Sequence, residues 1–150
     1  MSAQEETGSS QNETYGAVTG AYKVMARRIA GMFSEEGLTQ PQFQALRIVA
    51  KKGAVCMREI SDAMFVTPAN ITGIIDRLEA RGLLTRAGRK GDRRTTDIML
   101  TTKGKALQGR VAEKYSRFIQ DALGVFTQEE QKTLRDLLLK LQEGMSRSEV

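Results

Sequence analysis

The sequence predicts a mainly α-helical domain with one small β-hairpin, an α+β arrangement in a single domain of 150 residues. Three observations predict it. Apolar residues recur at helical spacing along most of the chain, the period changes to alternation between residues 83 and 100, and capping residues stand where each helix should begin.

Residues 1–13 are polar and have almost nothing to bury, so we expect a disordered tail there. A helix over 14–36 then carries a stripe whose spacing alternates between three and four residues, which is typical of a narrow helix–helix seam. The stripe consists of Tyr15, Val18, Tyr22, Met25, Ile29 and Met32. Gly37 can end this helix.

Thr39 and Gln42 form a capping box for the next helix, and Leu38 can pack against Phe43 at its start. Its apolar side is Phe43, Leu46, Val49 and Ala50, and Gly53 ends it. A very short strand over 54–55 and a helix over 57–64 are expected to follow. Phe65 and Val66 make an apolar turn.

Thr67 is the N-cap of the next helix, and Pro68 suits its first position. The inward side is Ile71, Ile74, Ile75 and Leu78, and the outward side is Ala69, Asn70, Thr72, Gly73, Asp76 and Arg77. Gly82 ends this helix.

Residues 83–87 and 96–100 read as two strands, and residues 88–94 between them form a hairpin tip with two glycines and four basic residues. Two C-terminal helices follow, one capped by Thr101 and one opened by a Thr127–Glu130 capping box. The last helix is leucine-rich, with Leu134, Leu137, Leu138 and Leu141.

Composition excludes several function classes. The chain has no histidine and one cysteine, which removes Ser-His and Cys-His nucleophile pairs and His-ligated metal sites. It has no phosphate-binding glycine loop, no apolar run of about 20 residues and no secretory signal. We therefore expect a cytoplasmic, nucleoid-associated protein that is not an enzyme and carries no cofactor or metal.

Charge points to an anionic partner. The net charge is +5, and eight basic residues against two acidic ones lie between Arg81 and Lys105. A helix, a turn, a second helix with a small polar outer face, and a basic hairpin form a winged helix-turn-helix over residues 38–101. Taken separately, the polar outer face could be an ordinary surface and the basic hairpin a solvated loop. Because the two lie next to each other, double-stranded DNA is the favoured partner.

At these motifs the chain resembles the MarR family of transcriptional regulators. Residues 91–104, GDRRTTDIMLTTKG, match the family's wing signature, Asp-x-Arg followed by a strand and Leu-Thr-x-x-Gly. Residues 38–43, the Thr67-Pro68 pair and residues 77–84 match its helix openings and recognition helix. The resemblance implies a homodimer built from residues 14–36 and 103–147, a pseudopalindromic operator, and in many members release by a small phenolic or lipophilic anion or by cysteine oxidation.

The candidate recognition-helix residues are Thr67, Ala69, Asn70, Thr72, Gly73 and Arg77. The candidate wing residues are Arg86, Arg89, Lys90, Asp92, Arg93 and Arg94. Asn70 and Thr72 can bond to bases or phosphates, and Arg93 or Arg94 can enter the minor groove with Asp92 holding the tip. Arg77 and Arg86 either contact phosphate or pair with Asp76 or Glu79.

The candidate dimer interface is Tyr15, Val18, Tyr22, Leu134, Leu138 and Leu141, whose alternative is an intramolecular bundle. A weaker effector pocket is Tyr22, Met25, Arg28 and Phe43. Cys56 is either a small hydrophobe or a reactive thiol, which would make the protein a redox sensor. A helical protein-interaction module without specific DNA binding is the other alternative. Operator, regulated genes, effector and sign of regulation stay open.

Overall fold

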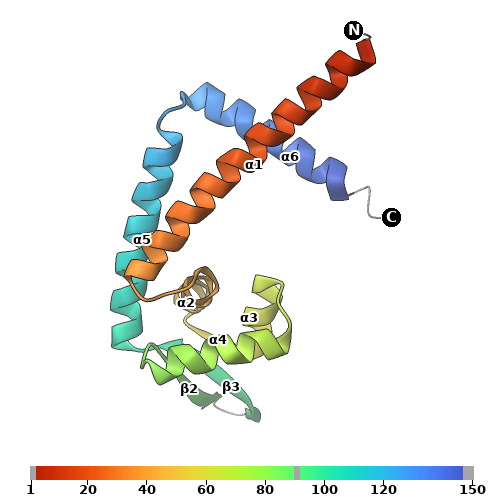
Figure 1. The fold of residues 1–150 in the computed structure, drawn as a ribbon. Helices are drawn as coiled ribbons and strands as arrows, with labels where there is room; N and C mark the ends of the chain where they lie inside the picture. The colour runs from red at the N-terminus through yellow and green to blue at the C-terminus, as the bar shows by residue number, and fades with distance from the viewer. Residues whose placement is uncertain (1–2, 90–91, 147–150) are drawn as a thin grey trace. The chain divides into compact units, whose positions relative to one another are not determined.

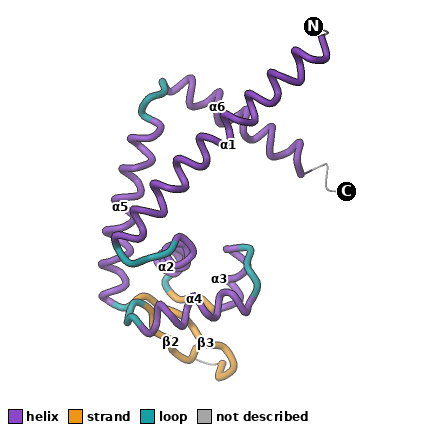
Figure 2. The backbone as a smooth tube through the Cα atoms, viewed as in Figure 1, coloured by secondary structure: helices purple, strands orange, loops and turns teal. Residues whose placement is uncertain are grey.

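The computed structural model describes residues 3–89 and 92–146, and among them the side chains of residues 8–88 and 96–146. The elements are α1 (Ala3–Glu35), α2 (Gln40–Lys52), β1 (Ala54–Cys56), α3 (Met57–Met64), α4 (Pro68–Ala80), β2 (Leu84–Arg89), β3 (Asp92–Leu100), α5 (Thr102–Leu123) and α6 (Gln128–Ser146). The predicted fold class is confirmed: helices dominate, with one small antiparallel sheet (Figures 1 and 2). The chain forms two compact units, Met1–Ala112 and Glu113–Val150.

The core of the first unit lies between α2, α3, α4 and the sheet, whose strand order is β1-β3-β2. Side chains buried there include Leu46, Val49, Val55, Ile60, Ile71, Ile75, Leu78 and Ile98. The expected short strand is present, and its Val55 pairs with Ile98 of β3. Phe33 near the end of α1 joins this core, with its ring centroid 4.8 Å from that of Phe43. Burying these side chains is what orients α4.

Helix α1 is longer than predicted. It begins at Ala3, so residues 3–13, expected to be a disordered tail, are helical. Helical hydrogen bonds are local, and a polar segment without β-branched runs or proline can continue a helix that is anchored elsewhere. The Thr14 hydroxyl, for example, donates to the Ser10 carbonyl at 2.9 Å. Gly37, with a φ of 65°, ends the helix as predicted.

The hairpin also differs from the expected one. The strands were expected over 83–87 and 96–100, but β2 reaches Arg89 and β3 begins at Asp92, so the basic segment 88–94 is largely strand. Backbone pairing does not depend on side-chain character, so the ladder continues into the polar segment. The register is irregular between Gly88 and Arg89.

The start of α5 packs tightly against the sheet. The Thr101 hydroxyl donates to the Gly82 carbonyl at 2.7 Å and accepts the Gly104 N–H at 3.0 Å, so Thr101 is the predicted cap. A Cβ at Gly104 would overlap the Leu83 carbonyl oxygen. Only glycine allows this close approach, which gives the Leu-Thr-x-x-Gly motif a physical basis.

The second unit contains the rest of α5, a turn and α6. The Thr127–Glu130 capping box is present: the Thr127 N–H donates to the Glu130 carboxylate at 2.8 Å, and the Glu130 N–H donates to the Thr127 hydroxyl at 3.2 Å. None of the described residues of α6 is buried. Its large apolar side chains Leu137, Leu138, Leu139, Leu141 and Met145 are all exposed.

Candidate nucleic-acid interface

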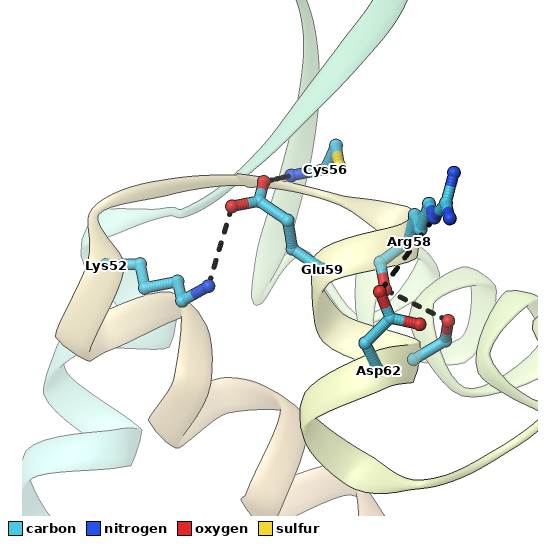
Figure 3. A network of polar contacts seen from close by, with 6 residues as sticks. Lys52, Cys56, Arg58, Glu59 and Asp62 are labelled. Carbon is cyan, nitrogen blue, oxygen red and sulfur yellow. Dashed lines mark hydrogen bonds and ion pairs between the residues drawn. The ribbon is translucent and has the colours of Figure 1, made fainter.

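Helices α3 and α4 form the helix-turn-helix, and α3 is fixed at its start by Glu59. The Glu59 carboxylate accepts the backbone N–H of Cys56 at 2.9 Å and lies 3.5 Å from the Lys52 ammonium (Figure 3). Hydrogen bonding by the Cys56 N–H lowers the pKa of Glu59 below its ordinary value, and Lys52 adds to this. Cys56 occupies the N-cap position as predicted, and its side chain is half-buried.

Helix α4 has the two faces that the sequence predicts. Thr67 caps it, with its hydroxyl accepting the Asn70 N–H at 3.4 Å, and Pro68 is its first residue. Ile71, Ile75 and Leu78 are fully buried. The candidate residues on the other face, Thr67, Ala69, Asn70, Thr72 and Arg77, are exposed, and Gly73 is half-exposed. The predicted recognition face is therefore free in this chain.

Thr72 has less freedom than its neighbours. Its hydroxyl donates to the Pro68 carbonyl at 2.8 Å, one turn earlier in the same helix. The oxygen can still accept a hydrogen bond, but its proton is already used. Asn70, whose amide both donates and accepts, is the better candidate for reading a base edge.

Arg86 of β2 bridges to α4, as in one of the two roles predicted for it. Its guanidinium lies 2.6 Å from the Asp76 carboxylate and also pairs with Glu79. The hydrogen bond that Arg86 donates to the Asp76 carboxylate is the main cause of the raised pKa of Arg86. The ion pair, one of the two roles predicted for Arg86, is thus present in the free chain, and the phosphate contact stays a prediction. Arg86 fixes the hairpin to the recognition helix, and Arg77 has no ion pair with any residue the structure describes.

The wing residues are placed only by backbone. Arg89 is the last residue of β2 and pairs in register with Asp92, which opens β3 ahead of Arg93 and Arg94. Their side chains, and all of Lys90, lie outside what the structure describes. Their roles at DNA, including Asp92 as a support, remain predictions.

The candidate effector residues are not brought together within one chain. Phe43 is buried against Phe33, whereas Tyr22 is 68% exposed. Tyr22 is 11 positions before Phe33 on α1, which is about 16 Å along the helix. Met25 and Arg28 are exposed between them. The candidate dimer residues Tyr15, Val18, Tyr22, Leu138 and Leu141 are exposed, and Leu134 is half-exposed.

The structure reveals a basic pocket that sequence analysis missed. A hollow of about 300 Å³ is lined by Glu36, Arg81, Leu83, Lys103, Ala106, Leu107 and Arg110. Arg81 donates to the Gly37 carbonyl at 2.5 Å, Lys103 to the Arg81 carbonyl at 2.9 Å, and Arg110 to the Glu36 carboxylate at 3.1 Å. These residues are up to 74 positions apart, so no local pattern signals the pocket.

Other site types receive no support. Over residues 3–89 and 92–146, no three Cys, Asp or Glu side chains are grouped so that they could hold a metal ion. Within the same described part of the chain, every helix is too short or too polar to cross a bilayer.

A helix-turn-helix with an exposed polar recognition face, joined by ion pairs to a two-stranded hairpin, defines a winged helix-turn-helix DNA-binding protein. Comparison with known proteins agrees: residues 38–96 match the model of the MarR family. The chain is 33% identical over 122 residues to the HTH-type transcriptional regulator PecS of Dickeya dadantii, covering 79% of this chain and 74% of PecS.

Solved structures give the same result. A putative MarR-like transcription regulator from Bacillus cereus is 30% identical, with a TM-score of 0.74, and the match covers 90% of this chain and 97% of that one. A mutant of MarR from E. coli complexed with operator DNA shares the fold at 23% identity, with a TM-score of 0.72 over 83% of this chain and 90% of that one. The chain belongs to the MarR family of transcriptional regulators. The family and these relatives are DNA-binding regulators, not enzymes, as the sequence predicts.

Proposed function

We propose that the protein is a homodimeric transcriptional repressor that binds a pseudopalindromic operator and is released by a small phenolic or lipophilic anion. The observation that carries the proposal is the exposed N-terminal half of α4 next to a hairpin held by Arg86. A helix of this diameter fits the major groove, and its first residues then lie closest to base edges. A repressor with this function acts at the nucleoid, in the cytoplasm.

Two kinds of DNA contact are assigned. Asn70, with Ala69 and Gly73 leaving space beside it, reads base edges, and Thr67 presents the positive end of the helix dipole to phosphate. Arg77, Arg89 and Lys90 neutralise phosphates, and Arg93 or Arg94 enters the minor groove. Asp92 supports the hairpin tip.

The proposed dimer explains two exposed apolar faces. Tyr15 and Tyr22 on α1 are 71% and 68% exposed, and Leu137 on α6 is 59% exposed. Water-exposed apolar stripes of this extent are typical of interaction surfaces. A second copy of the chain would bury both stripes. In the resulting dimer, two recognition helices about 34–36 Å apart would match the two half-sites of an operator.

The basic pocket is the better place for an effector. Arg81, Lys103 and Arg110 supply three positive charges against Glu36, and Leu83, Ala106 and Leu107 supply an apolar wall. This combination suits an aromatic or lipophilic carboxylate. Arg81 is also the C-cap of α4, so an anion that draws its guanidinium from the Gly37 carbonyl would act on the recognition helix. Titration of salicylate into wild type and Arg81→Gln tests this: equal affinity for both would contradict it.

The DNA proposal is tested with a duplex selected by the wild-type protein from random sequences. Asn70→Ala is expected to weaken binding to the selected duplex by about 1–3 kcal/mol and to leave binding to random DNA nearly unchanged. Arg89→Ala is expected to weaken both and to lower the salt slope by about one, with Lys132→Ala, on α6 and outside the winged helix-turn-helix, as a basic control. Sedimentation should give twice the 16.6 kDa chain mass.

Failure to select any duplex, or a persistent monomer on the duplex, would contradict the proposal. The exposed apolar faces also favour the second candidate, a helical protein-interaction module, for which no dimer–duplex complex would survive physiological salt. Repression is tested separately by transcription in vitro from a template that carries the selected site: the protein should reduce transcript, and an increase would refute the repressor role.

A further inference from the structure

Phe65, in the turn between α3 and α4, is under two unfavourable constraints at once. It is the only non-glycine residue with positive φ in the part of the chain the structure describes, at φ 53° and ψ 41°. Its side chain is also 97% exposed. A left-handed conformation costs a bulky L-residue free energy that glycine avoids, and an exposed aromatic ring contributes nothing to the core.

The backbone at Phe65 is set by the helix end. The Phe65 N–H donates to the Asp62 carbonyl at 3.3 Å, and the Val66 N–H donates to the Ser61 carbonyl at 3.1 Å. This left-handed closure of α3 is the position where glycine, and after it asparagine, is usual. The conformation is therefore imposed by the turn, and a phenylalanine there is not explained by the stability of the free protein.

Phe65 is next to the recognition surface. It lies two residues before the N-cap Thr67, and Thr67, Pro68, Ala69 and Asn70 are all exposed. In a helix-turn-helix the first helix crosses the DNA backbone and the second enters the major groove by its N-terminal residues. The turn between them consequently lies at the rim of the major groove.

The charges around the turn are compatible with DNA. From Ala63 to Ile75 the sequence contains no acidic residue. Asp62, the nearest carboxylate before the turn, is 3.9 Å from the Arg58 guanidinium one turn earlier in α3 (Figure 3). Asp62 is the only acidic residue within five positions of Phe65, so little negative charge lies near the ring in the sequence.

We propose that Phe65 packs against an apolar edge of duplex DNA at the rim of the major groove, either a thymine 5-methyl group or deoxyribose carbons. Both partners offer bare carbon to the exposed ring, and thymine methyl is a known partner for apolar side chains. The contact buries the ring only in the complex, so the strain in the free protein serves binding. This inference rests on the proposed DNA-binding function.

The test compares Phe65→Gly with Phe65→Leu on the duplex selected by the wild-type protein. Phe65→Gly relieves the positive φ and removes the ring: its melting temperature should rise, and its affinity for the duplex should fall about tenfold. Phe65→Leu keeps both apolar bulk and strain, so stability and affinity should stay close to wild type. A gain in stability together with a loss in binding is not produced by a merely structural residue.

The two possible contacts of the ring, thymine methyl and deoxyribose, are then distinguished by replacing operator thymines one at a time with deoxyuridine, which lacks the methyl group. A thymine contact predicts one position where the replacement weakens wild type but not Phe65→Gly. A deoxyribose contact predicts equal effects on both proteins at every position, with the tenfold loss in Phe65→Gly retained.

Unchanged duplex affinity in Phe65→Gly would overturn the proposal. A lower melting temperature for Phe65→Gly would overturn the strain argument. Wild-type binding to a selected duplex is the starting point of every arm, so these outcomes are distinguishable from failure of the DNA-binding function itself.

Discussion

Arg86 gives the sharpest prediction, because its two candidate roles affect two different measurable quantities. In the structure its guanidinium pairs with Asp76 and Glu79 on the recognition helix. Replacing it by glutamine removes the charge and keeps most of the side chain. If Arg86 joins the hairpin to α4, the free energy of unfolding falls; if it contacts phosphate, the salt dependence of DNA binding falls instead.

The magnitude follows from exposure. The Arg86 side chain is 29% exposed, Glu79 35% and Asp76 55%, so both pairs are partly screened by water. Such pairs are each worth about 0.5–1 kcal/mol, well below the cost of about 3–5 kcal/mol for removing one partner of a fully buried pair. Arg86→Gln should therefore cost about 1–2 kcal/mol. For a chain of this length that lowers the melting temperature by about 2–8 °C.

Thermal unfolding and duplex titrations at several salt concentrations measure both quantities. Arg86→Gln should melt earlier and keep the wild-type salt slope. Arg77→Gln is the matched control, because Arg77 is exposed on α4, the helix that carries the partners of Arg86, and has no ion pair among the described residues. It should keep the melting temperature and lower the slope by about one. Full stability in Arg86→Gln with a slope reduced by one would refute the ion-pair role.

Three further predictions concern single residues. Hydrogen bonding lowers the pKa of Glu59, so its contribution to stability is complete above about pH 4.5 and is lost as pH falls through the lowered pKa. In acid titration, the free energy of unfolding of Glu59→Gln should therefore fall less steeply with pH than that of wild type, and an equally steep fall would contradict this. Gly104→Ala places a Cβ on the Leu83 carbonyl and should destabilise by about 1–3 kcal/mol in chemical unfolding, whereas Gly109→Ala, which meets open space, should not. Cys56→Ser should keep duplex affinity, and peroxide should leave wild-type affinity unchanged; a peroxide-induced loss absent from Cys56→Ser would establish a thiol sensor.

Sequence by itself determined the features that depend on residues a few positions apart. The capping pairs at Thr39, Thr67 and Thr127, the helix end at Gly37 and the bounds of α3 all matched prediction. Capping hydrogen bonds join residues within one turn, so their signals lie within one turn of sequence. The two faces of α4 followed from its period in the same way, and with the wing motif they were sufficient to indicate the family.

Tertiary structure decided what depends on which elements meet. Arg86 had phosphate and carboxylate as possible partners, and only the packing of β2 on α4 brought Asp76 and Glu79 to it. The pocket around Arg81 joins positions that no periodicity connects, and the exposure of Phe65 depends on where the core ends. The predicted start of α1 was wrong for a related reason. A hydrophobic pattern indicates which residues are buried, and the first turns of this helix consist of polar residues that have no such pattern.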